Sequence, residues 1–181
     1  FQVASVADSK YEFVELYNAG TYSVDLYGWD LKKRTSSGTF GNLAMNITGT
    51  IPARGFFLIA SQEYNGNVSP DVRYTQASNT LAGSNNSVVL VDGDGAIYDE
   101  VSYAEEISND QSLERKALSN SSCVSSQGAG EYLGNGCDVS GNISDFEARA
   151  TPNPQNSPAL PEPRDAPLAI SGFQAGYTSS T

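Results

Sequence analysis

The sequence predicts an all-β protein built as an antiparallel β-sandwich, and two observations carry that prediction. Short apolar runs of strand length recur, separated by turn-forming residues about every ten positions, and an apolar period of 3.6 residues is almost lacking. The clearest run is YEFVELYN at residues 11–18, where apolar and acidic side chains are interleaved before the turn Asn18-Ala19-Gly20. Many short strands without helices are typical of two packed antiparallel sheets.

The first half of the chain supplies further strand candidates. FQVASV at residues 1–6 is a short one, and residues 21–33 contain a strand with a bend at Gly28. Residues 34–48 are expected to be loop-like and then only weakly apolar. FFLIA at residues 56–60 is a continuous apolar run, which is typical of a buried, central strand.

The second half opens with the strongest hairpin signal in the sequence. SVVLV at residues 87–91 and AIYDEVSY at residues 96–103 are joined by DGDG, and Asp-Gly pairs favour tight hairpin turns. Because side chains alternate between the faces of a strand, one face of the second strand is expected to carry Ile97, Asp99, Val101 and Tyr103.

The chain is predicted to divide into a sandwich at residues 1–158 and a tail at residues 159–181. Prolines in ATPNPQNSP exclude a helix or a central strand before the tail, and ALPEPRD reads as a stiff linker. The following APLAISGFQAGYT is strand-like, and it could begin a further domain or be donated to a neighbouring subunit. The candidate assembly strand comprises Leu168, Ile170, Phe173 and Tyr177.

Large apolar side chains of these strands are the predicted core. Trp29 is the single tryptophan and is expected to be the largest anchor, with ligand stacking as the alternative. The predicted core anchors are Phe13, Leu16, Trp29, Phe57 and Ile59.

Charge and composition exclude several classes of function. A formal net charge of −11 and a pI near 4.2 disfavour binding to nucleic acid or to anionic lipid. No apolar run approaches the length that spans a bilayer. The sequence contains no histidine, which removes the commonest general base and the commonest ligand of transition metals.

The two cysteines bracket a loop that is too rich in Gly and Ser to be held by packing. We therefore predict a disulfide between Cys123 and Cys137, which implies an oxidising, extracytoplasmic compartment; two unrelated thiols in a reducing compartment are the alternative. Five sequons are compatible with an extracellular or cell-surface location, and their asparagines are Asn46, Asn67, Asn85, Asn120 and Asn142.

Taken in order, several of these segments resemble the lamin tail domain family, an immunoglobulin-like β-sandwich. The matching pieces are EFVELYN, LYGWDL, IPARGFFLIA, SVVLVDGDGAIYDEVSY, SLER and TPNPQN, spread over residues 1 to about 158. The resemblance implies core and turn roles for these residues and no catalytic site. The cysteine loop and the tail depart from the family pattern.

Acidic residues at the predicted hairpin suggest a calcium site. Asp92, Asp94 and Asp99 could supply oxygen ligands, and the intervening glycines allow a tight turn. However, the spacing lacks the remaining ligands of an EF-hand loop, and Asp-Gly suits a hairpin turn without metal. The turn alone is the favoured interpretation, and no other cofactor is expected.

Glu12 and Glu15 are the other acidic candidates. Their spacing places them on opposite faces of a strand, so they cannot form a catalytic pair. One is expected in solvent, and the other is expected to pair with Arg115 or Arg54.

These observations predict a non-enzymatic, extracellular or cell-surface module for structure, adhesion or assembly. Its expected partners are proteins, and identical subunits could join head to tail into filaments by exchange of terminal strands. The alternatives are an accessory domain of a larger secreted hydrolase, and a calcium- or glycan-binding module.

Overall fold

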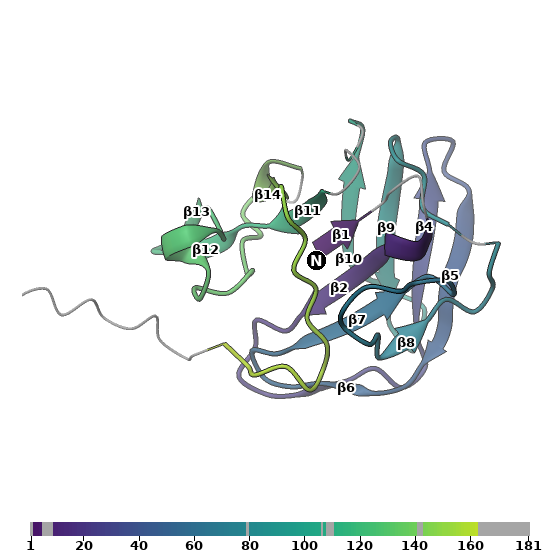
Figure 1. Ribbon diagram of the computed structural model, residues 1–181, viewed down its shortest axis with the longest axis horizontal. Coiled ribbons are helices and arrows are strands. Elements are labelled where there is room, and N and C mark those ends of the chain that lie inside the picture. Colours follow the sequence, from purple (N-terminus) through teal and green to yellow (C-terminus); the bar gives the residue numbers. More distant parts are fainter. Residues whose placement is uncertain are drawn as a thin grey trace, which may run out of the picture.

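A computed structural model describes residues 2–4, 9–78, 80–105, 107, 111–140 and 143–162. Two sheets pack face to face in these residues, and the only helical segments are three short 3₁₀ turns (Figure 1). The prediction of an all-β, immunoglobulin-like sandwich is confirmed. Within the described part of the chain, no helix has the length and apolar character needed to cross a membrane.

The larger sheet has six strands in the order β14-β11-β1-β2-β7-β8. Every neighbouring pair is antiparallel except β7 and β8, which are parallel. The predicted strand FFLIA is β7, whose five residues are all buried and which lies between β2 and β8. The six strands are β1 (Gln2–Ala4), β2 (Phe13–Tyr17), β7 (Phe56–Ala60), β8 (Val72–Arg73), β11 (Ser112–Arg115) and β14 (Phe146–Arg149).

The second sheet has the order β10-β9-β4-β5 and is fully antiparallel. Its strands are β4 (Trp29–Thr35), β5 (Phe40–Ile47), β9 (Asn86–Val91) and β10 (Ile97–Tyr103). The predicted hairpin is β9 and β10. The segment at residues 34–48, expected to be loop-like and then weakly apolar, has β5 as its weakly apolar part, an eight-residue edge strand. Its alternation is masked by two register shifts against β4, so buried and exposed positions do not follow a strict period of two.

Two short ribbons complete the secondary structure. β3 (Val24–Asp25) pairs with β6 (Thr50–Ile51), and β12 (Ala117–Ser119) pairs with β13 (Ser122–Val124). The second ribbon projects away from the sandwich (Figure 1). Its two turn residues, Asn120 and Ser121, have φ of 48° and 64°, as a two-residue hairpin of right-handed twist requires. The 3₁₀ turns are η1 (Ser9–Tyr11), η2 (Gly128–Gly130) and η3 (Ile143–Asp145).

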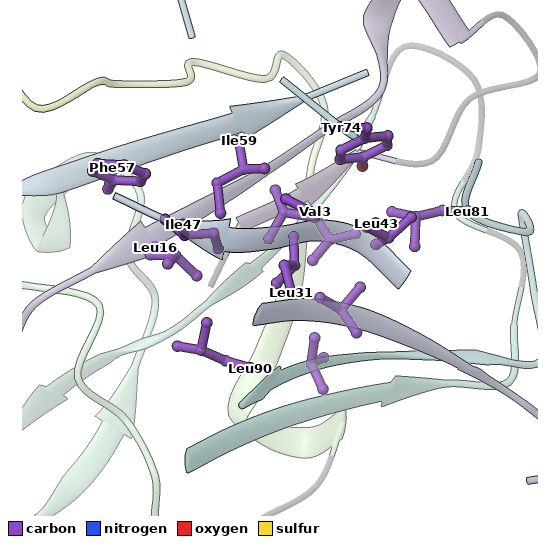
Figure 2. Packing of buried hydrophobic residues seen from close by; sticks show 14 of the residues in the cluster. Val3, Leu16, Leu31, Leu43, Ile47, Phe57, Ile59, Tyr74, Leu81 and Leu90 are labelled. Carbon is purple, nitrogen blue, oxygen red and sulfur yellow. The ribbon is translucent and has the colours of Figure 1, made fainter. Parts of the chain in front are cut away.

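The main core lies between the two sheets, where side chains from β2 and β7 meet those of β4, β5 and β9 (Figure 2). Of the predicted anchors, Leu16, Phe57 and Ile59 belong to this core. Phe13 is also buried, but it packs with Leu58, Ala60 and Tyr64 on the outer face of the six-stranded sheet. Trp29 is only half-buried and packs against the edge of the main core.

The outer face of the six-stranded sheet is covered by a strap, residues 151–162, which crosses β2 and β7 in Figure 1. The backbone N–H of Gln155 donates to the Glu15 carboxylate. Ser157 donates to Asp71 through its N–H and its hydroxyl, at 3.0 and 2.6 Å. The N–H of Glu162 donates to the carbonyl of Arg54 at 2.9 Å. Residues on both sides of the predicted boundary at 158 therefore contact the sandwich, whereas residues 163–181 lie outside the described part.

Candidate functional site

The strongest candidate site is a cleft of about 400 Å³ at one end of the sandwich. One wall is the loop at residues 17–24, and the other is the start of the edge strand β10. Its floor is apolar and reaches the main core, and its rim is aromatic. We call it the aromatic cleft, and its rim consists of Tyr22, Trp29 and Tyr98.

Local backbone features place the two facing rings of the rim. Gly28 has φ of 78°, a value that suits glycine, and the N–H of Trp29 donates to the carbonyl of Leu26 at 3.0 Å. A β-bulge between Ile97 and Asp99 redirects Tyr98. The Trp29 and Tyr98 ring centroids lie 4.8 Å apart, with an interplanar angle of 56°. The bulge also leaves Ile97 exposed, so its expected place beside Val101 and Tyr103 was wrong.

The loop wall is held by a buried amide. The Asn18 side chain donates to the carbonyls of Tyr22 and Pro52, at 2.8 and 3.0 Å, and accepts from the N–H of Gly20 at 2.9 Å. This fixes the path of the loop while the Tyr22 side chain remains 84% exposed. Tyr98 is 64% exposed, so the rim offers aromatic surface to a partner over a preformed floor.

Asp99, at the bottom of this wall, forms an ion pair that joins the two sheets. Arg115 Nη2 of β11 donates to both Asp99 carboxylate oxygens, at 2.8 and 2.9 Å. Arg115 Nη1 donates to the carbonyl of Cys137 at 3.0 Å, and its guanidinium lies 4.7 Å from the centre of the Phe146 ring. The Arg115 side chain is 6% exposed, so this is a buried cation with several partners.

Two of the three aspartates proposed as calcium ligands, Asp92 and Asp99, accept hydrogen bonds from different parts of the protein. Asp92 Oδ1 accepts from the N–H groups of Asp94 and Ala96, at 3.0 and 2.9 Å, which closes the hairpin turn. Asp99 faces Arg115 instead. Among the described residues, these side chains do not gather into a three-ligand group. Calcium binding stays a prediction.

Glu12, directly before β2, and Glu15, within it, differ from expectation, because both are buried. Glu12 Oε1 accepts from the N–H of Leu81 at 3.0 Å, and burial raises the Glu12 pKa to about 7. Burial likewise raises the pKa of Glu15 to about 8. Neither forms an ion pair with Arg54 or Arg115, since one meets the core and the other lies under the strap. Because the core covers one face of this segment and the strap covers the other, neither carboxylate can point into solvent.

Cys123 and Cys137 form a disulfide, with their Cα atoms 5.4 Å apart. The buried Asp145 carboxylate lies beside them and accepts from the Ser140 hydroxyl at 2.6 Å. These three side chains are the only metal-ligand-type cluster in the described residues, but the sulfurs are bonded to each other. The cluster therefore anchors the loop between β13 and β14.

Replacing both cysteines by serine is expected to lower the free energy of unfolding by about 3 kcal/mol, because the unfolded chain regains the entropy of the closed loop. Urea unfolding of the wild-type and double-serine proteins would measure this. Dithiothreitol should destabilise the wild type by a similar amount and leave the double-serine variant unchanged. Full reduction of the wild type, verified by mass spectrometry, without a change in stability would contradict the prediction.

The remaining predicted sites are surface positions or lie outside the described residues. The exposed sequon asparagines are Asn46, Asn67, Asn85 and Asn120. Three of them, Asn46, Asn85 and Asn120, have positive φ, so their backbone conformation gives a second reason for Asn there. Asn142 and the candidate assembly strand, Leu168, Ile170, Phe173 and Tyr177, are not among the described residues.

The fold and these sites define an immunoglobulin-like β-sandwich module. The chain belongs to the lamin tail domain family, whose model matches residues 2–105. The match ends after β10, while β11 and β14, which complete the six-stranded sheet, come later in the chain. The family is non-catalytic. No curated protein matches the chain.

Proposed function

We propose that this chain is a non-enzymatic, extracellular or cell-surface module for structure, adhesion or assembly. In this proposal, an extended segment of a protein partner adds to the edge strand β10 and places a side chain in the aromatic cleft. The observation that carries the proposal is the coincidence of a sheet edge and a preformed aromatic cleft at the same residues, Tyr98 and Asp99.

Strand addition fits the chemistry of β10. This strand pairs with β9 on one side and ends its sheet on the other, so it offers main-chain groups to a further strand. Charges usually discourage such pairing, but here Glu100 is paired with Arg34 and Asp99 with Arg115. In strand addition, main-chain hydrogen bonds provide affinity and side-chain pockets provide specificity.

The described residues bring together no catalytic group of side chains, which supports a binding role. Glu12 accepts from Leu81, Glu15 accepts from Gln155 of the strap, and the sequence has no histidine that could act with them. The disulfide supports an oxidising, extracytoplasmic location.

The partner that fits best is a second copy of this chain. The tail sequence places Leu168 and Ile170 two residues apart, with Phe173 and Tyr177 beyond, and alternate apolar residues are what a half-buried added strand requires. Because the tail and β10 are different segments of the chain, such a contact is head-to-tail and would propagate into filaments.

We expect the full chain to associate with rising concentration in sedimentation velocity, and to form filaments visible by electron microscopy. Tyr98→Ala, which removes one side of the cleft, and Ile170→Asp, which disrupts the donated strand, should each abolish association. Tyr27→Ala is the matched control, because Tyr27 is 76% exposed and lies outside the cleft lining. A wild-type chain that stays a monodisperse monomer at high concentration would refute self-assembly, and unchanged association of Tyr98→Ala would refute the role of the cleft.

A further inference from the structure

A second, larger groove lies on the opposite side of the six-stranded sheet from the core. Its volume is about 840 Å³, within the range of small-ligand sites. One wall is the start of the strap and the other is the loop at residues 64–68, with Tyr11 and Phe13 between them. We call it the strap groove.

None of the described side chains that line the strap groove carries a charge. This is unusual in a chain with 21 acidic and 10 basic residues. The lining combines aromatic rings with carboxamides, each of which has both donors and acceptors. The carboxamides are those of Asn65, Asn67, Gln111, Asn153 and Gln155.

We propose that the strap groove binds a neutral oligosaccharide. Tyr11 is 51% exposed and offers a flat apolar surface to the C–H face of a sugar ring, over the buried rings of Phe13 and Tyr64. Carboxamides can donate to and accept from hydroxyl groups. The net charge of −11 repels anionic ligands, and the groove has no carboxylate that would select a cation. A neutral, polyhydroxylated ligand can stack on an aromatic ring, exchange hydrogen bonds with carboxamides and avoid repulsion by the acidic chain.

A proline-rich peptide is the other class that aromatic grooves accept, but this groove favours the sugar. Pro152 and Pro154 of the strap already line one wall, so the chain's own prolines take up part of the apolar lining. The Asn153 amide donates to Glu131 at 3.3 Å. The other four carboxamides still exceed the few polar contacts that a proline-rich helix, which lacks most N–H donors, can use.

The walls of the groove are preorganised, which lowers the entropic cost of binding. The Tyr64 ring packs edge-on against Phe13, with centroids 6.2 Å apart. The N–H of Asn65 donates to the carbonyl of Lys10 at 3.0 Å, tying the loop to the η1 turn. The strap is held by the bond from Gln155 to Glu15. Tyr11 is 51% exposed, and its ring remains available for stacking.

The test is titration of the full chain with neutral tetrasaccharides of glucose, xylose, mannose and N-acetylglucosamine, followed by calorimetry and amide NMR shifts. The protein should be made without N-glycans, so that a glycan on Asn67 cannot occupy the groove. We expect at least one sugar to bind, with shifts confined to residues of the groove, and Tyr11→Ala to weaken it about tenfold. Tetragalacturonate, an anionic sugar, should not bind.

Tyr22→Ala is the matched control, because Tyr22 is an exposed tyrosine of the aromatic cleft. Unchanged sugar affinity in this variant would separate the strap groove from the self-assembly site, so each proposal can fail alone. The proposal is overturned if no neutral sugar shifts groove residues, if Tyr11→Ala binds as tightly as the wild type, or if decaproline binds there and the sugars do not.

Discussion

Replacing Glu15 by glutamine is expected to remove much of the pH dependence of folding stability. The pKa of the Glu15 carboxyl is raised from 4.5 to about 8 by burial, partly offset by the bond from the N–H of Gln155. The folded protein therefore holds a proton that the unfolded chain loses above pH 4.5. The stabilisation from this group is complete below pH 4.5 and is lost as the pH rises to about 8, a loss of roughly 5 kcal/mol.

Urea unfolding at intervals from pH 5 to 9 would measure this effect. Glutamine keeps an oxygen that can accept from the N–H of Gln155 but has no charge to bury. The pH dependence of stability of the Glu15→Gln variant should therefore come only from the other titratable groups. Glu12 adds a second decline between pH 4.5 and about 7, which Glu15→Gln should retain. Glu105→Gln, at an exposed position, should behave as the wild type. A wild-type stability that stays constant from pH 5 to 8 would contradict the burial of both carboxylates.

Arg115→Met is expected to lower the free energy of unfolding by about 3 kcal/mol. The change removes two bonds to Asp99, one to the carbonyl of Cys137 and the contact with the Phe146 ring. It also leaves Asp99 and the carbonyl without their partner, and removing one member of a buried pair is strongly destabilising. Removing one member of a buried pair usually costs about 3–5 kcal/mol. The Asp99 side chain is 34% exposed, so water can partly solvate its charge, and the expected loss is at the lower end of this range.

Arg34→Met is the comparison, because the pair of Arg34 and Glu100 is more accessible to water, with side-chain exposures of 35% and 21%. Its loss should be below about 1 kcal/mol. Adding Asp99→Asn to Arg115→Met should recover part of the stability, which a double-mutant cycle would measure. Equal losses for Arg34→Met and Arg115→Met would show that the ion pair of Arg115 and Asp99 between the sheets stabilises the fold no more than an accessible pair does.

The sequence was sufficient for the fold class, the family and the strands with strong local signals. FFLIA is wholly buried, and the DGDG segment joins β9 and β10 as expected. The disulfide followed from two cysteines around a loop too rich in Gly and Ser to be held by packing. Each of these features is local in the sequence, so it leaves a pattern that can be read there.

Features created by tertiary packing were not predictable. Glu15 lies on a strand whose alternation suggests one solvated face, but the strap, far along the chain, covers that face. The contact between the Trp29 and Tyr98 rings depends on a β-bulge in β10. No turn-forming residue in that part of the sequence indicates the bulge. The tyrosines around Trp29 in TYSVDLYGWD were the only signal for the aromatic cleft.

The position of β1 has a consequence for how the chain reaches its folded state. β1 lies between β2 and β11, and Val3 is opposite both Val14 and Leu113. During synthesis this strand leaves the ribosome long before Leu113 does, so the larger sheet cannot close until most of the chain is available. Such non-local pairing makes folding slow. Until β11 is synthesised, β1 presents an open edge that a folding factor could protect.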